Sequence, residues 1–220
     1  HVTGVQTCAL PISSGNGHDG TATGTTFSTD VRDVTRTGVS ANTRLKTQNF
    51  TNSLHFINNT TDKVTVSGIG GYFTQLGTYT VSCWFKLDIS KATNMQIWGC
   101  STSGSNRNCL TVNQGVIGFQ RYNGSGYTGK VSLSTDGIIQ KDKWYFAICE
   151  NNAGTISLTL NGSDISNSGN NYASQSITNF VIGYSGSNTN GATAFAGEIA
   201  KLNSWSRVLT SSEKDDLYKK

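Results

Sequence analysis

The sequence predicts an all-β protein, a sandwich of two antiparallel sheets with one short C-terminal helix. Many short runs alternate apolar and polar residues; in TISLTL, residues 155–160, Ile156, Leu158 and Leu160 fall on one face. Clusters of Gly, Asn and Ser separate these runs at close spacing, as is typical of turns between strands. About ten such runs, with almost no helical periodicity, exclude a nucleotide-binding α/β fold.

The clearest of these runs form a predicted hairpin. The strand led by Trp144 and the strand at 155–160 flank the polar turn ENNAG, residues 150–154. The pair Asn161-Gly162 follows directly and suits positive φ, so the chain is expected to turn again there. The alternation at 155–160 predicts a half-buried strand with one side facing water.

The N-terminal part of the chain differs in composition from the rest. VTGVQTCALPI, residues 2–12, resembles a translated sequencing adapter, so we interpret residues 1–13 as an artefact. The alternative, a remnant of a signal peptide, lacks a long apolar core and preceding basic residues. Residues 14–43 are rich in Gly, Ser and Thr and predict a linker or loose arm, although Val31 to Val39 would suit an edge strand. Residues 44–220 are expected to form the domain.

Strands are expected along the whole of that domain. The predicted runs are 53–57, 63–66, 79–87, 95–100, 109–112, 116–122, 130–134, 144–149, 155–160, 180–184 and 194–205. After the last run, Thr210 and Glu213 have the spacing of a capping box, which predicts the start of the C-terminal helix. Leu217 and Tyr218 are expected to hold that helix against a sheet.

Several stretches resemble the laminin-G-like family. They are SLHF with DKVTVSG between residues 53 and 68, YTVSCWFKL at 79–87, and a closing pattern that runs from FAGEI to LNSWSRVLT. The resemblance covers about Asn49 to Tyr218. It implies a concanavalin A-like jelly roll and an extracellular location, at a cell or virion surface or as a secreted protein.

Charge and hydropathy exclude some partners. The 17 basic and 13 acidic residues give a net charge of +4 and are scattered without runs of one sign, which disfavours nucleic-acid binding. No apolar run approaches the roughly 20 residues of a membrane span. The resemblance to the laminin-G-like family implies instead that the partners are a glycan or polysaccharide and the other domains of a larger protein.

Catalytic patterns of enzymes with this fold are missing from the sequence. Retaining glucanases need two carboxylates about 5 Å apart, whereas Glu150, Glu198 and Glu213 are each isolated. Polysaccharide lyases of this fold use a Gln-x-His strand, and in the run Gln96-Ile97-Trp98 a tryptophan stands in place of the histidine. The histidine of the first strand, His55, fits a surface or packed position better than a catalytic one. We predict a domain that is not an enzyme.

A glycan site is predicted on the middle strands. The resemblance implies that the concave face carries aromatic rings, which stack on sugars, and planar polar groups, which bind their hydroxyls. The candidate residues are Trp98, Gln120, Arg121, Tyr122, Asn123 and Tyr127. The alternative for each aromatic residue is a place in the core, which we expect for Trp84, Trp144 and Trp205.

Two further features concern metals and cysteines. Relatives often bind calcium at a rim, and Asn58, Asn59 and Asp62 offer oxygen ligands in the first turn. A polar turn without an ion is the default expectation, because Ala200 stands where the family usually has an aspartate. Cys100 and Cys109 could form a disulfide across a hairpin. Cys83 and Cys149 are expected to be buried thiols, and the cysteine spacing disfavours structural zinc.

The leading prediction is a non-catalytic module for carbohydrate binding or adhesion in a secreted or surface microbial protein. The alternative is a structural or spacer domain, for instance of a viral fibre or of a multidomain surface protein, that binds no small ligand. A glycan-active enzyme of the same fold is the third option. No cofactor is predicted other than the calcium ion considered above.

Overall fold

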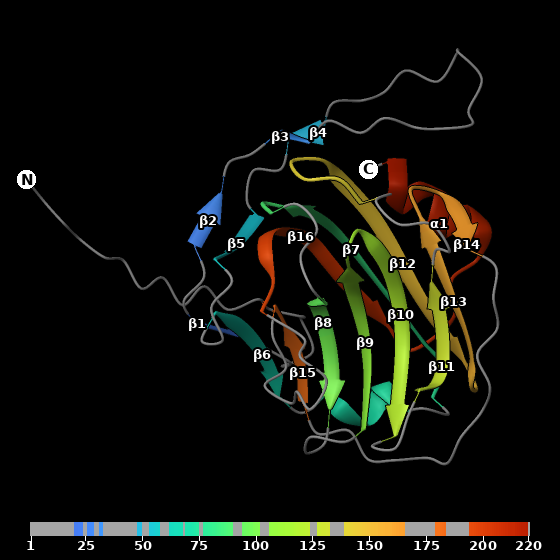
Figure 1. The fold of residues 1–220 in the computed structure, drawn as a ribbon. Coiled ribbons are helices and arrows are strands. Elements are labelled where there is room, and N and C mark those ends of the chain that lie inside the picture. Colours follow the sequence, from blue (N-terminus) through green and yellow to red (C-terminus); the bar gives the residue numbers. More distant parts are fainter. Residues whose placement is uncertain are drawn as a thin grey trace, which may run out of the picture.

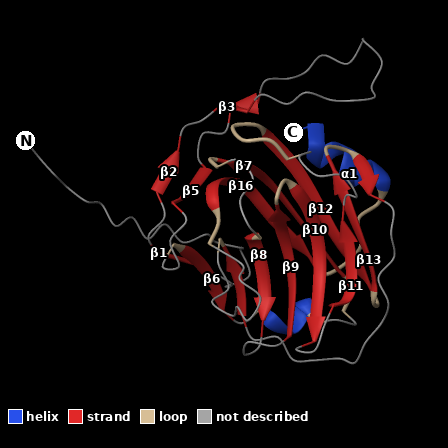
Figure 2. Cartoon of the chain, in the orientation of Figure 1, coloured by secondary structure: helices blue, strands red, loops and turns tan. Residues whose placement is uncertain are grey.

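Two antiparallel sheets are stacked face to face in the computed structural model of the protein (Figures 1 and 2). The structure describes residues 20–23, 26–28, 31–32, 48–49, 53–57, 62–67, 69–74, 77–89, 94–101, 106–123, 127–132, 139–165, 179–183 and 194–219. The predicted all-β sandwich is confirmed, and residues 1–13 lie outside the described part.

The front sheet, named for its place in Figure 1, has the strand order β1-β6-β15-β8-β9-β10-β11. Its strands are β1 (Gly20–Thr23), β6 (Lys63–Ser67), β8 (Met95–Ser101), β9 (Asn106–Asn113), β10 (Val116–Asn123), β11 (Tyr127–Ser132) and β15 (Asn179–Ile182). All neighbouring strands in this sheet are antiparallel.

The back sheet has the order β14-β13-β12-β7-β16-β5-β2. Its strands are β2 (Thr26–Ser28), β5 (Ser53–Ile57), β7 (Tyr79–Leu87), β12 (Trp144–Asn152), β13 (Thr155–Leu160), β14 (Ser163–Ile165) and β16 (Ala196–Trp205). The remaining elements are the separate pair β3 (Val31–Arg32) and β4 (Gln48–Asn49), the 3₁₀-helix η1 (Gly70–Phe73) and the helix α1 (Ser211–Lys219).

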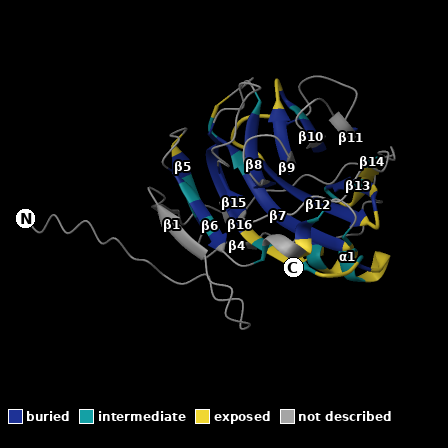
Figure 3. Ribbon diagram, turned by 90° about the horizontal axis from the view of Figure 1, so that it is seen from below, coloured by how far each residue is buried: buried dark blue, intermediate teal, exposed yellow. Residues whose placement is uncertain are grey.

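The main core lies between the sheets and follows from the period of two in each strand. Ile156, Leu158 and Leu160 of β13 all enter it, as predicted from their alternation. The odd-numbered residues of β7, from Tyr79 to Leu87, enter it as well. Figure 3 shows this burial along the strands of both sheets, with exposed residues gathered on α1 and the turns.

A second apolar cluster lies on the outer face of the back sheet, because β7 and β12 also carry large apolar residues at their outward positions. Trp84 and Phe146 lie there, and Tyr218 of α1 covers them with ring centroids at 5.7 and 5.8 Å. Trp144 belongs to the same cluster. The helix α1 thus covers the outer face of the back sheet, and Leu217 and Tyr218 hold it there, as was expected from the sequence.

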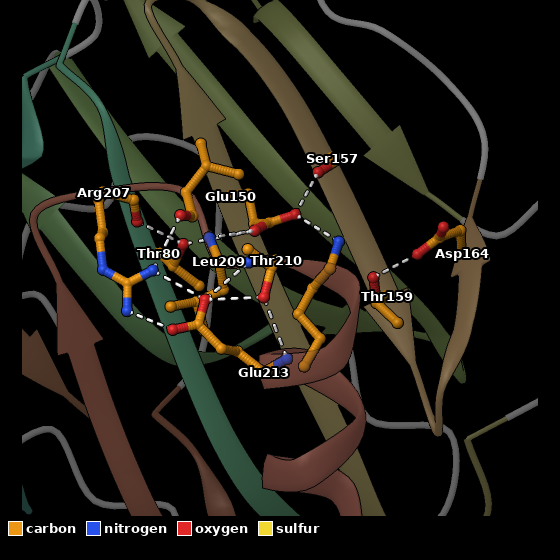
Figure 4. A network of polar contacts seen from close by, with 11 residues as sticks. Thr80, Glu150, Ser157, Thr159, Asp164, Arg207, Leu209, Thr210 and Glu213 are labelled. Carbon is orange, nitrogen blue, oxygen red and sulfur yellow. Dashed lines mark hydrogen bonds and ion pairs between the residues drawn. The ribbon is translucent and has the colours of Figure 1, made fainter.

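Glu150 ties the segment before α1, and α1 itself, to the back sheet (Figure 4). Its carboxylate accepts hydrogen bonds from Leu209 N at 3.2 Å and from Ser157 Oγ at 3.3 Å. Lys214 Nζ of α1 lies 2.9 Å from the same carboxylate. With 5% of its surface exposed, this glutamate is paired and buried, and it is held by structural contacts.

The predicted linker at residues 14–43 is structured in part. Gly20–Thr23 pairs with β6 at one edge of the front sheet, and Thr26–Ser28 pairs with β5 at one edge of the back sheet. Backbone pairing with an existing edge supplies hydrogen bonds to residues that have little apolar surface to bury. Composition alone therefore underestimated the order of this segment.

Candidate ligand-binding face

The outer face of the front sheet is built from polar and small residues that lie in register across neighbouring strands. One row consists of Thr65, Val181, Gly99, Cys109, Gln120 and Lys130, and the next consists of Gln96, Thr111, Gly118 and Ser132. We call these two rows the polar face. It differs from the outer face of the back sheet, where a large apolar cluster lies under α1.

Two glutamines of the polar face are placed by glycines. A methyl group on Gly99 would collide with the Gln96 side-chain amide, so this amide lies against the backbone at the glycine. A methyl group on Gly118 would lie 3.2 Å from Gln120 Nε2. Only 2% of Gln96 and 7% of Gln120 are exposed, so both side chains are buried.

Exposure increases across the polar face toward β11. Thr111 is 3% exposed and donates from Oγ1 to Gly118 O at 3.4 Å. On β11, by contrast, Ser132 is half-buried and Lys130 is exposed. A ligand approaching from the side of β11 would therefore meet Lys130 and Ser132 first, with the buried Gln120 amide behind them.

Beyond Gln120, a further register row of β9, β10 and β11 contains two aromatic residues. Tyr122 of β10 lies opposite Tyr127 of β11 on one side and opposite Arg107 of β9 on the other, with a β-bulge between Arg121 and Tyr122. Asn123 ends β10 opposite Asn106. Two of the predicted aromatic residues are thus register partners beside the polar face, and sequence reasoning missed Arg107 as their neighbour.

Trp98 does not belong to the polar face, and this part of the site prediction was wrong. Strict alternation would put Trp98 on the same face as Gln96, but a bulge lies between these two residues in the pairing with β9. Trp98 therefore points into the core, where it is 0% exposed and stacks on Phe180 at 5.5 Å between centroids. It packs the sandwich and is not accessible to a ligand.

Arg121 was also assigned to the wrong face. It follows Gln120 on β10 and so points inward, with 1% of its surface exposed. Its Nη1 donates to Gly154 O of the β12–β13 turn at 2.8 Å, and its Nη2 donates to Asn151 Oδ1. Burial lowers the pKa of this guanidinium. Arg121 links the two sheets.

The predicted calcium ligands are only partly described. Asp62 is 2% exposed, and its Oδ2 accepts a hydrogen bond from Ile57 N at 3.2 Å, which closes the turn between β5 and β6. Asn58 and Asn59 lie outside the described residues. Within the described part of the chain, no three His, Cys, Asp or Glu residues are grouped to hold a metal ion. Calcium at this turn stays a prediction.

The proposed disulfide is not formed, since Cys100 and Cys109 are both free thiols. Cys100 lies opposite Asn108 and Cys109 lies opposite Gly99, so the two cysteines occupy successive register positions. Successive side chains of a strand point to opposite faces, so Cys100 enters the core while Cys109 belongs to the polar face. Their Cβ vectors diverge, which prevents the bond.

The isolated glutamates and the first-strand histidine have structural partners. Glu198 accepts a hydrogen bond from Ser53 Oγ at 2.6 Å and pairs with Lys86 Nζ at 2.9 Å. His55 Nε2 lies 2.7 Å from Asp88 Oδ2. These contacts lie on the back sheet and its rim, away from the polar face, and none of them joins two carboxylates.

Comparison with known families identifies the class of the protein. The model of the Concanavalin A-like lectin/glucanases superfamily (Laminin_G_3) matches residues 58–213, and the chain belongs to this family. A search of curated proteins gave no significant match. In the described part of the chain, no helix has the length and apolar character needed to cross a bilayer.

Solved structures share the fold at low sequence identity. The binding domain of botulinum neurotoxin serotype G has a TM-score of 0.66 at 14% identity, over 94% of this chain and 47% of that one. The binding domain of Paraclostridial Mosquitocidal Protein 1 has a TM-score of 0.61 at 14% identity, over 95% and 50%. The chain spans about half the length of these toxin domains.

Domain 4 of AbnA, a GH43 extracellular arabinanase from Geobacillus stearothermophilus, is similar over nearly its whole length. Its TM-score is 0.61 at 15% identity, and the match covers 93% of this chain and 91% of that one. That structure was solved in complex with arabinotriose. At such identities these matches establish the fold and not the ligand.

Proposed function

We propose that the protein is a non-catalytic carbohydrate-binding module of a larger secreted or surface protein, and that the polar face of the front sheet is its binding surface. The observation that carries this proposal is the row of polar side chains at the β11 edge of this face, where the exposed Lys130 lies opposite Gln120 and the half-buried Ser132 lies two residues further along β11. Planar amides and hydroxyls are the donors and acceptors that sugar hydroxyls require.

Tyr122 and Tyr127, in the neighbouring register row, stay our candidates for the apolar part of sugar recognition. Tyr122 and Tyr127 are register partners at the end of the same sheet, and tyrosine rings offer a flat surface for the C–H face of a pyranose or furanose ring. Glycan ligands of related binding domains, such as the arabinotriose of the arabinanase domain, support this class of ligand. With one or two rings, we expect millimolar dissociation constants, about −4 kcal/mol.

The experiment is a binding titration with arabino-oligosaccharides and a panel of soluble polysaccharides, read by affinity electrophoresis and calorimetry. We expect Gln120→Ala and Lys130→Ala each to weaken binding to the retained glycan about 5- to 20-fold, or 1–2 kcal/mol, because each removes hydrogen bonds to a sugar hydroxyl. Lys141→Ala is the matched control, since Lys141 is exposed outside the polar face.

Two results would count against the proposal. If no glycan of the panel binds at millimolar concentration, the alternative of a structural or spacer domain gains support. If a glycan binds but Gln120→Ala, Lys130→Ala and Lys141→Ala bind it equally well, the site lies elsewhere. Release of products from any polysaccharide would instead support an enzyme.

A further inference from the structure

Four polar side chains meet inside the inter-sheet core, where β9 and β10 face β7 and β12. Asn108 and Arg121 are register partners in the front sheet, and Tyr79 and Asn151 are register partners in the back sheet. The hydrogen bond from Arg121 Nη2 to Asn151 Oδ1 joins the two pairs. We call these four residues the polar box.

Most polar atoms of the box have partners, and these partners fix the orientation of both amides. Asn108 Nδ2 donates to Phe73 O at 2.7 Å, and Asn151 Nδ2 donates to Gly77 O at 2.7 Å. The Asn108 Oδ1 atom must therefore be the acceptor that points away from Phe73. The assignment of oxygen and nitrogen in this amide follows from the network.

Three atoms of the box have no partner among the residues that the structure describes: Tyr79 Oη, Asn108 Oδ1 and Arg121 Nε. Their residues are 0%, 0% and 1% exposed. Tyr79 and Asn108 share Phe73 as a neighbour, since its ring lies 5.1 Å from the Tyr79 ring. Burial raises the pKa of Tyr79 and the nearby Arg121 guanidinium partly opposes this rise, so the hydroxyl keeps its proton.

If one molecule joins these three atoms, their chemistry specifies what it is. Arg121 Nε–H needs an acceptor, Asn108 Oδ1 needs a donor, and the Tyr79 hydroxyl can serve as either. The guanidinium repels a cation. A simple anion has no hydrogen to donate to Asn108 Oδ1. Water supplies both an acceptor lone pair and two donor hydrogens.

We propose that the polar box holds one buried water molecule, which accepts from Arg121 Nε–H, donates to Asn108 Oδ1 and bonds the Tyr79 hydroxyl. A buried water of this kind typically makes about three hydrogen bonds. It completes a bridge between the sheets directly behind β10, whose Gln120 faces the opposite way on the polar face.

The sign of a stability change tests the proposal. If the Tyr79 hydroxyl were unpaired, Tyr79→Phe would remove a buried polar group without a partner and would raise the urea midpoint of the full chain. If water bonds the hydroxyl, the midpoint falls. Tyr145→Phe is the matched control, because its hydroxyl accepts from Gln140 N at 2.9 Å and its loss must lower the midpoint. An unchanged or higher midpoint for Tyr79→Phe overturns the proposal.

Crystallography provides an independent test that does not depend on stability. At about 1.5 Å resolution, wild-type crystals should show one density peak within about 3.2 Å of all three atoms. The same peak should remain in Tyr79→Phe crystals, bonded to the two other residues. Crystals soaked in bromide should give no anomalous signal there. Absence of the peak in the wild type, or a bromide signal at its position, overturns the assignment of water.

Discussion

Glu213 stabilises the start of α1 by several contacts at once. Its carboxylate accepts from Thr210 N at 2.8 Å, and Thr210 Oγ1 accepts from Glu213 N at 3.3 Å, which confirms the predicted capping box. Arg207 Nη2 lies 2.6 Å from the same carboxylate, a contact that the sequence spacing did not indicate. Figure 4 shows these groups on the outer side of the back sheet.

These contacts predict how the cap responds to acid. The hydrogen bond from Arg207 and the cap lower the pKa of Glu213 from 4.5 to about 2. The folded state thus favours the charged carboxylate, and its contribution to stability is complete above pH 4.5 and is lost as the pH falls toward 2. Carboxyl NMR titration should give a midpoint near 2 for Glu213, and a midpoint near 4.5 would contradict the prediction.

Single residues also mark where sequence reasoning about the site failed. Alternation could place Gln120 on an outer face, and its neighbour Arg121 then had to point inward. The two residues could not both contact a ligand, because successive side chains of a strand point to opposite faces of the sheet. Asp62 was found as a turn residue, but whether its oxygens bind a backbone N–H or an ion depends on contacts that no local pattern specifies.

At the scale of elements, strand positions and the C-terminal helix could be predicted because their signals are local. Alternation located β7 and β13, and Thr210 with Glu213 located α1. The bulge in β8 has no such signal, since its extra residue is visible only in the pairing with β9. That bulge is the reason why Trp98 packs in the core and does not line the polar face.

The helix α1 leads to a prediction about stability. Tyr218 is 5% exposed and stacks on Trp84 at 15° between ring planes. We expect Tyr218→Ala to lower the free energy of unfolding by about 2–4 kcal/mol, since it uncovers a buried ring cluster. Urea unfolding followed by tryptophan fluorescence measures this change. The exposed Asp216→Ala is the control, and equal midpoints for both variants would contradict the prediction.

For the whole molecule, the fold class was predictable because two sheets with alternating faces account for most of the chain. The edge strands could not be predicted in this way. β1 and β2 come from a segment whose composition is typical of a linker, and they form strands because they pair with the open edges of the two sheets. Which residues lie together on one face of a sheet was harder still to predict. It depends on strand register, which brings together residues that are far apart in the sequence.

The sandwich as a whole is held without disulfides in its described part. Cys83, Cys100, Cys109 and Cys149 are free and buried, and burial raises the pKa of the Cys100 and Cys149 thiols, which makes them unreactive at neutral pH. In a Cys8→Ser variant, we expect the urea midpoint to be equal with and without dithiothreitol. Iodoacetamide should label four thiols in urea and none under native conditions. A lower midpoint on reduction would contradict this prediction.

The pleat of the front sheet has a consequence for how such modules diversify over evolutionary time. Residues that a ligand would meet occupy every second position, while the residues that bind the sheets together occupy the positions between them. Even among the first kind, Gly99 tolerates little change, because a methyl group there would collide with the Gln96 amide. The architecture accommodates wide divergence in sequence, since the binding domain of botulinum neurotoxin serotype G shares the fold at only 14% identity.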